Sequence, residues 1–146
     1  MIKIIVGEAD FDAGEWLSQL ETLGGGAVAS FTGVVRGDDS LRSLRLDHYP
    51  AMTEAQIGRI VDQAQSRWPL LGIVVIHRVG ELLPGERIVF VGTASRHRAA
   101  ALESSAFLID WLKSSAPFWK KESFADGRTH WVEARVEDDA ERDRWT

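Results

Sequence analysis

The sequence contains no cysteine, one tyrosine and only four prolines among its 146 residues. A chain without cysteine can form neither a disulfide framework nor a thiolate metal site, and it has no thiol of its own to act as a nucleophile or carry a persulfide. Any sulfur that the chain handles must therefore arrive on another molecule.

The sequence also lacks long apolar runs. It has no apolar stretch of about 18 residues and no charged-then-apolar pattern at the N-terminus, so neither a membrane span nor secretion is indicated. We therefore expect a cytoplasmic protein. Its histidines are scattered, without the paired spacing of a zinc or iron site: His48, His77, His97 and His130.

Negative charge dominates the composition, with a net charge of -5 and a pI near 5.3, which argues against a general nucleic-acid binder. The segment from Arg96 to Lys121 is the exception, with five basic and two acidic residues. Trp111, Phe118 and Trp119 are interleaved with the lysines, and such aromatic residues can form a partly desolvated wall that shifts lysine pKa values. The segment is either a solvated basic surface or a site that binds anions.

A long amphipathic helix is predicted at the start of this segment, with Ser95 as its N-cap. Pro117 cannot continue a helix, so the helix should end near Ser114 or Ser115. Residues at spacings of three and four should face a core, with a lysine at the edge of the stripe: Ala99, Leu102, Ala106, Ile109 and Lys113.

After this helix, residues 118–124 alternate as a strand, with Phe118, Lys120, Glu122 and Phe124 on one side. Lys113 and Lys120 can therefore converge only across the turn that joins helix and strand. The cations at the helix start, 96–98, lie about 15 residues away, or roughly 22 Å along the helix axis. They reach the same pocket only if it is large or if the site is built from two chains.

The whole chain predicts one α+β domain over residues 1–146, with 45% hydrophobic residues to form a core. Two further helices are expected, at 11–23 with Asp10 or Asp12 as cap and at 52–68 with Thr53 as a candidate cap. Strands are expected at 2–6, 27–35, 41–49, 73–79, 88–94, 118–124 and 129–136.

The strands at 27–35 and 41–49 should pair as a hairpin, and Asp126-Gly127 should form the turn of a second hairpin. The three glycines at 24–26 are interpreted as a flexible turn, because a phosphate-cradling loop would need a following GKS or GKT. The tail at 137–146 should be a short helix or a frayed end.

Arg36 is expected at the end of the strand 27–35, where its fixed fork of donors suits an anion. A surface arginine paired with Asp38 or Asp39 is the alternative, and the sequence leaves both open. His48 and His77 are interpreted as structural hydrogen-bonding residues.

Six segments carry a family resemblance in a fixed order: FTGVVRG (31–37), LDHYPAMTE (46–54), VVIHRVGELLPGE (74–86), SRHRAA (95–100), LKSSAPFWKKE (112–122) and WVEAR (131–135). On these segments the sequence resembles the catalytic large subunit of molybdopterin synthase. Six ordered segments are far more specific than any single motif.

The resemblance implies an α/β hammerhead-like α+β domain, with a mixed or antiparallel sheet and packed helices. It also implies a homodimer of large subunits with a small ubiquitin-like sulfur-carrier subunit on each side, which makes a heterotetramer. The family converts cyclic pyranopterin monophosphate into molybdopterin, and the two dithiolene sulfurs arrive as a thiocarboxylate on the carrier's C-terminal Gly-Gly. The step needs no metal or other cofactor.

Carried over position by position, the resemblance implies two catalytic residues, Lys113 as the essential lysine and Lys120 as the second active-site lysine. The implied substrate-binding residues are Arg36, His97, Arg98, Lys121, Glu122 and Arg135, the last reaching the pocket from the neighbouring large subunit. The family often has a lysine where this chain has Val34, which removes one positive charge near the phosphate.

Two other functions are compatible with the sequence. A non-catalytic module could bind an anion, a nucleotide or an RNA fragment through the basic and aromatic patch at 96–121. An assembly scaffold with the same fold would bind the carrier without making product. The enzyme additionally requires a groove, lined by apolar and aromatic residues, that leads the carrier's tail from the surface to Lys113.

Overall fold

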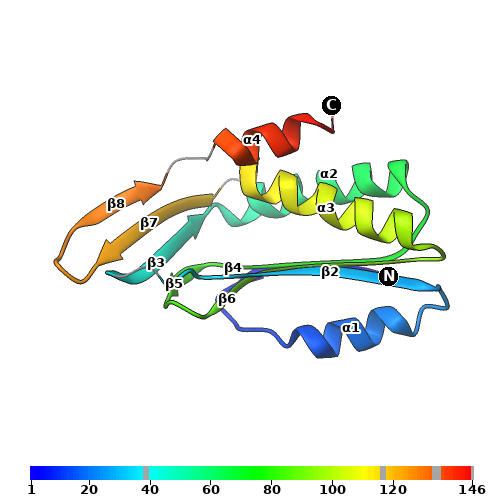
Figure 1. Cartoon of the computed structure of the whole chain (residues 1–146), viewed down its shortest axis with the longest axis horizontal. Helices are drawn as coiled ribbons and strands as arrows, with labels where there is room; N and C mark the ends of the chain where they lie inside the picture. The colour runs from blue at the N-terminus through cyan, green and yellow to red at the C-terminus, as the bar shows by residue number, and fades with distance from the viewer. Residues whose placement is uncertain (38–39, 116–117, 133–135, 146) are drawn as a thin grey trace.

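The computed structural model describes residues 1–37, 40–115, 118–132 and 136–145. A central sheet lies between helices, with α2 and α3 on one face and α1 on the other, and a second sheet extends from one end of these layers (Figure 1). The arrangement confirms the predicted α+β class.

The first sheet has the order β1-β4-β6-β2. Its strands are β1 (Ile2–Gly7), β2 (Ala27–Val34), β4 (Leu70–Arg78) and β6 (Arg87–Ser95). β1 runs parallel to β4, and the other two pairs are antiparallel. β4 reads as a nearly continuous apolar run because it is central and covered on both faces.

Three helices cover this sheet, and a fourth packs on one of them: α1 (Ala13–Glu21), α2 (Pro50–Arg67), α3 (Arg98–Ser114) and α4 (Val136–Asp143). Apolar side chains of α2 and α3 meet one face of β4 and β6, and those of α1 meet the other. None of the helices in the described parts of the chain is long and apolar enough to cross a membrane.

The second sheet has the order β5-β3-β7-β8 and is antiparallel. Its strands are β3 (Leu41–His48), β5 (Gly80–Leu82), β7 (Phe118–Phe124) and β8 (Thr129–Val132). A buried apolar cluster joins it to the end of the first sheet: Val35, Leu46, Val79 and Leu82. β5 was not predicted, because three residues within a turn-containing loop leave no recognisable alternation.

The predicted hairpin between residues 27–35 and 41–49 is wrong, although both strands exist. β2 pairs with β6 in the first sheet, whereas β3 pairs with β5 and β7 in the second. After β2, the N–H of Val35 donates to the carbonyl of Glu86, and the side chain of Val35 enters the cluster between the sheets. The chain therefore passes from one sheet to the other where we expected a simple reversal.

The second predicted hairpin is confirmed. β7 pairs with β8 across a turn in which Gly127 has a φ of 90°, a conformation that favours glycine. The described part of the strand after this turn is Thr129–Val132, and Val136, the predicted last residue of the strand, instead begins α4.

The helix caps were predicted with mixed success. Asp12 caps α1 as expected, accepting from the N–H groups of Gly14 and Glu15. Thr53 does not cap α2, which begins at Pro50 because proline needs no hydrogen-bond partner for its nitrogen in a first turn. Ser95 is the last residue of β6, and its hydroxyl donates to the carbonyl of Pro69.

The predicted inner face of α3 is also wrong. Leu102 is 59% exposed, and the buried residues of the helix are Ala101, Ser104, Ser105, Phe107, Leu108 and Leu112. Two serines can face the sheet because their hydroxyls are satisfied there: Ser104 donates to the carbonyl of Ala101, and Ser105 bonds with Thr93. Small polar side chains thus share the inner face of α3 with the apolar Phe107, Leu108 and Leu112.

Arg78, at the end of β4, is a buried charged clamp with 7% of its surface exposed. Its guanidinium donates to the carbonyl of Glu8 at 3.1 and 3.2 Å and to the carbonyl of Arg87 at 2.9 Å. The same group lies 3.5 Å from a carboxylate oxygen of Glu86. One side chain therefore ties the ends of β1, β4 and β6 together.

We expect Arg78→Met to lower the free energy of unfolding by about 3 kcal/mol, because it removes a buried guanidinium and leaves two partly buried carbonyls without their charged donor. Arg87→Met is the matched control, since Arg87 pairs with Asp10 at the exposed surface and should cost much less. Urea denaturation of both variants measures the difference. Equal losses would show that Arg78 is no clamp.

Candidate active site

Lys113 lies in the last turn of α3 with its side chain exposed. The helix ends at Ser114, with Ser115 as C-cap donating its N–H to the carbonyl of Trp111 at 2.7 Å, so the predicted helix end is confirmed. Pro117, the residue used to predict this end, lies outside the described residues. The lysine also places a positive charge at the negative end of the helix dipole.

Lys120 lies on β7, on the face of the second sheet that turns toward the first. In the antiparallel register Lys120 is opposite Leu46, and Phe118 is opposite His48. Directly opposite residues share a face, and Leu46 is fully buried in the cluster between the two sheets. The alternation predicted from the sequence therefore directs Lys120 inward, beside the junction.

His77 lies at this junction, near the end of β4, and only 6% of it is exposed. Its ring stacks on Phe118 with a centroid distance of 3.8 Å and an interplanar angle of 16°. Its Nδ1 lies 2.8 Å from the carbonyl oxygen of Arg78, so that nitrogen carries the proton and donates. The structural role predicted for His77 is thus confirmed.

The electrostatics of His77 connect the two lysines. The pKa of His77 is lowered from 6.5 to about 4: burial is the largest cause, the bond to the Arg78 carbonyl raises the pKa, and the nearby Lys120, His48 and Lys113 lower it. The two lysines, which are seven residues apart on different elements, therefore lie close enough to one imidazole for both charges to act on it. The ring stays neutral at physiological pH.

Arg36 lies at the end of the first sheet that also carries His77. Gly33 of β2 and His77 of β4 both pair with Val89 of the central β6, and Arg36 follows Gly33 by three residues. Its side chain is exposed. Asp38 and Asp39, the alternative partners of Arg36, lie outside the described residues.

The neighbours of Lys120 point in different directions. Glu122 shares its face and lies 3.6 Å from Nδ1 of His130. Lys121 lies on the opposite face, with its ammonium 5.7 Å from the ring centre of Trp131, a cation–π distance. Within one chain, the strand separates Lys121 from the face that carries Lys120.

His97 and Arg98 lie at the far end of the molecule. His97 is the N-cap of α3 and Arg98 its first residue, so they stand one helix length from Lys113, about 22 Å for 15 residues. Both side chains are exposed. The structure therefore does not bring them to the lysines of their own chain, and Arg135 lies outside the described residues.

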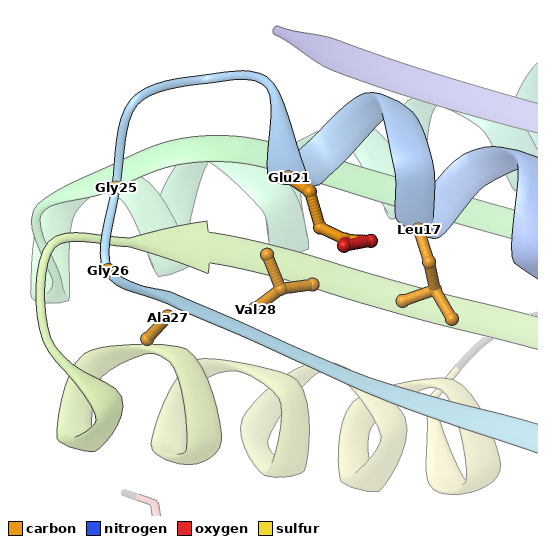
Figure 2. Close-up of a pocket in the computed structure, with 6 residues that line it drawn as sticks. All are labelled: Leu17, Glu21, Gly25, Gly26, Ala27 and Val28. Atoms are coloured by element: carbon orange, nitrogen blue, oxygen red, sulfur yellow. The ribbon is translucent and has the colours of Figure 1, made fainter.

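A hollow of about 400 Å³ opens near this far end, lined by Leu17, Glu21, Gly25, Gly26, Ala27 and Val28 (Figure 2). The glycines there are required by close packing, because a Cβ on Gly25 would lie 2.4 Å from the carbonyl oxygen of Ser95. The titratable group in this lining is the carboxylate of Glu21, which does not suit an anionic substrate. The lysines lie elsewhere, and the hollow is not the site.

Known proteins match the chain over nearly its whole length. A family model described as MoaE protein matches residues 6–115. The chain belongs to the MoaE protein family. It is 49% identical to the molybdopterin synthase catalytic subunit of Escherichia coli (strain K12), covering 98% of this chain and 97% of that protein. It is 48% identical to the same-named protein of Pseudomonas aeruginosa, over 99% of both.

Solved structures of MoaE proteins share the fold. The MoaE protein from Burkholderia ambifaria superposes with a TM-score of 0.84 at 42% identity, covering 99% of this chain and 98% of that one. A protein–protein complex of subunits 1 and 2 of molybdopterin-converting factor from Helicobacter pylori matches with a TM-score of 0.72 at 26% identity, covering 92% and 91%. The family resemblance in the sequence is confirmed.

The burial of His77 predicts a pH-dependent loss of stability. Its folded-state pKa, about 4, lies below its unfolded value of 6.5, so the unfolded chain binds the proton first. The stabilisation by the neutral ring is therefore complete above pH 6.5 and is lost as the pH falls toward 4. A gap of about 2.5 pKa units corresponds to about 3 kcal/mol.

Urea denaturation between pH 7 and pH 4 measures this effect when wild type is compared with His77→Phe, which cannot titrate at that position. The free energy of unfolding of wild type should fall by about 3 kcal/mol more than that of the variant. Parallel pH profiles would mean that the His77 ring is accessible to protons in the folded state.

Proposed function

We propose that the chain transfers sulfur from the C-terminal thiocarboxylate of a small carrier subunit to cyclic pyranopterin monophosphate, forming the dithiolene of molybdopterin. The observation that carries the proposal is that the register of β7 directs Lys120 to the junction of the two sheets, where Phe118 on the same face stacks on His77. The names of the relatives, molybdopterin synthase catalytic subunits at 48 to 49% identity, support the same reaction.

The residues suit the charges of the reactants. The pterin precursor is a phosphate ester and the donor is a thiocarboxylate, so two anions must approach each other. Fixed ammonium groups offset their repulsion and stabilise negative charge as it develops in the transition state. A guanidinium at Arg36, on the same end of the sheet, can bind the phosphate through its fork of donors.

The chain itself carries no sulfur nucleophile, because it has no cysteine. In each transfer the thiocarboxylate sulfur forms a bond to a side-chain carbon of the pterin precursor and displaces an oxygen from it, which leaves as water in one transfer and as the freed phosphate oxygen of the opened cyclic ester in the other. Water then hydrolyses the thioester bond between that sulfur and the carrier's acyl carbon. The carrier leaves as a carboxylate. A lysine can supply or accept the protons that these two steps move, and Lys113 and Lys120 are assigned that role.

A small-subunit partner is supported by the solved Helicobacter pylori complex, which contains subunits 1 and 2 of molybdopterin-converting factor. The carrier's C-terminal tail would enter between the end of α3 and the start of β7. His48 and Phe118 line that junction, with ring centroids 6.3 Å apart, and could form part of the expected aromatic groove.

Lys113→Ala should lower the rate of molybdopterin formation by at least about a hundredfold, because it removes a preorganised charge from the transition state. Lys3→Ala is the matched control, since Lys3 is an exposed lysine on β1, away from the junction. The assay mixes the chain with a thiocarboxylated carrier and the pterin precursor. A near-normal rate for Lys113→Ala, with the fold intact by circular dichroism, would refute its role.

A homodimer would explain why His97 and Arg98 stand one helix length from Lys113. The outer surface of α3 and the neighbouring β2 carries apolar side chains: Leu102 is 59% exposed and Phe31 36%. β2 is also an edge strand of the first sheet. A second copy that covers this surface would bury it and could bring its own His97 and Arg98 to the first copy's lysines, within a heterotetramer.

A complementation experiment tests whether the site is shared. Lys113→Ala and Arg98→Ala should each be inactive alone. After unfolding and refolding together in equal amounts, half of the dimers are mixed and each mixed dimer holds one intact site of two, so about a quarter of wild-type activity should return.

The complementation experiment has two controls. Each variant refolded alone should stay inactive, and wild type refolded alone should recover its full activity. No recovery in the mixture would mean that Lys113 and Arg98 of the same chain act together, or that Arg98 belongs to no active site.

A further inference from the structure

The two lysines are carried by different parts of the fold. Lys113 belongs to α3, which packs on β2 and β6 of the first sheet. Lys120 belongs to β7 of the second sheet. The distance between their ammonium groups is therefore set by how the two sheets are joined, and a small tilt of one sheet would change it.

Two contacts among the described residues contribute to this joint. One is the apolar cluster of Val35, Leu46, Val79 and Leu82, against which Phe118 also packs and which has no directional preference. The other is the stack of His77, from the first sheet, on Phe118, from the second, at 3.8 Å and 16°. Phe118 stands two residues before Lys120 on the same face of β7, so the position of its ring constrains that of the lysine.

The His77 ring is itself firmly held. Its Nδ1–H donates to the carbonyl of Arg78, and the guanidinium of Arg78 binds the carbonyls of Glu8 and Arg87. The ring is thus fixed to the clamp that ties β1, β4 and β6 together. It therefore provides a fixed surface on which the ring of Phe118 stacks.

We propose that His77 is a positioning residue, which holds Phe118, and through it Lys120, at a fixed distance from Lys113. The charged or titratable groups around it are Lys120 on β7, Lys113 on α3, His48 on β3 and the adjacent Arg78, whose guanidinium is directed to backbone carbonyls. A neutral ring suits this place, because a charged one would add a third cation near the two lysines. A test of this role by molybdopterin formation rests on the proposed function, whereas a test by the distance between the two lysines does not.

Chemical cross-linking measures the geometry directly. A short amine-reactive cross-linker is applied to the dilute protein at pH 8, and the yield of the Lys113–Lys120 link is quantified by mass spectrometry. His77→Ala removes the ring and should lower this yield at least about fivefold, whereas His77→Phe restores an uncharged stacking ring and should stay within about twofold of wild type. Val74→Ala, on the same strand but facing α1, is the control for a cavity in the core.

Molybdopterin formation provides the second readout. His77→Ala should lower kcat at least about tenfold, since misplacement of reacting groups by about 1 Å can cost a hundredfold, while His77→Phe should keep most of the activity. Phe118→Ala should cause the same losses, and the double variant should add little to either single one because both remove one contact.

The outcomes separate the roles of His77. An unchanged Lys113–Lys120 yield in His77→Ala, or additive losses in the double variant, would overturn the positioning role. A loss in His77→Phe as large as in His77→Ala, with the same melting temperature as wild type, would assign His77 a chemical role and overturn it as well. If wild type gives no turnover, the proposed function fails, yet the cross-linking comparison still decides the positioning role.

Discussion

The junction between the two sheets is the contact on which the rest of the molecule depends. The first sheet carries α3 and therefore Lys113, and the second carries Lys120 on β7. Neither layer holds both lysines. An apolar cluster and one stacked pair of rings fix the two layers against each other, so the same contacts that bury apolar surface also define the proposed catalytic geometry.

In the proposed site two ammonium groups would stand near each other and repel, which would cost stability in the absence of the substrate. Functional sites commonly retain such a cost because the bound anions reverse it. The neutral imidazole of His77 would add no further charge to this site. Burial disfavours its protonated form, and the cations around it do so again, so the pKa of His77 falls to about 4 and the ring contributes no charge of its own. A lysine or arginine at this position would instead repel both ammonium groups.

The sequence predicted those features that depend on short-range patterns. The cap at Asp12, the end of α3 and the hairpin around Gly127 all follow from local backbone chemistry. The alternation of β7 likewise placed Lys120 and Glu122 on one face, as the register confirms. These local signals do not depend on which distant part of the sequence packs against the segment.

The features that failed depend on partners far away in the sequence. Alternation shows that residues 27–35 and 41–49 are strands, but it cannot show that β6 and β7 are their neighbours. A serine is normally a surface residue, so no periodicity rule finds Ser105 against the sheet until Thr93 is known to stand opposite it. His77 was recognised as structural, but its stack on Phe118 across the junction of the two sheets requires the tertiary fold.

The misassigned face of α3 has a physical meaning. Serines and small residues turn inward where hydroxyl partners exist, and this leaves Leu102 on the outer surface of α3, a helix that packs on β2, the strand of the exposed Phe31. The inner face still buries Phe107, Leu108 and Leu112, but the exposed side chain of Leu102 contributes nothing to the core of a monomer. In a symmetric dimer the same face would be buried, and the helix would serve one site with Lys113 at its C-terminal end and the other with Arg98 at its N-terminal end. A helix shared by two sites would then explain both features: the exposed Leu102 would be buried in the dimer, and Lys113 and Arg98 would each serve a different site.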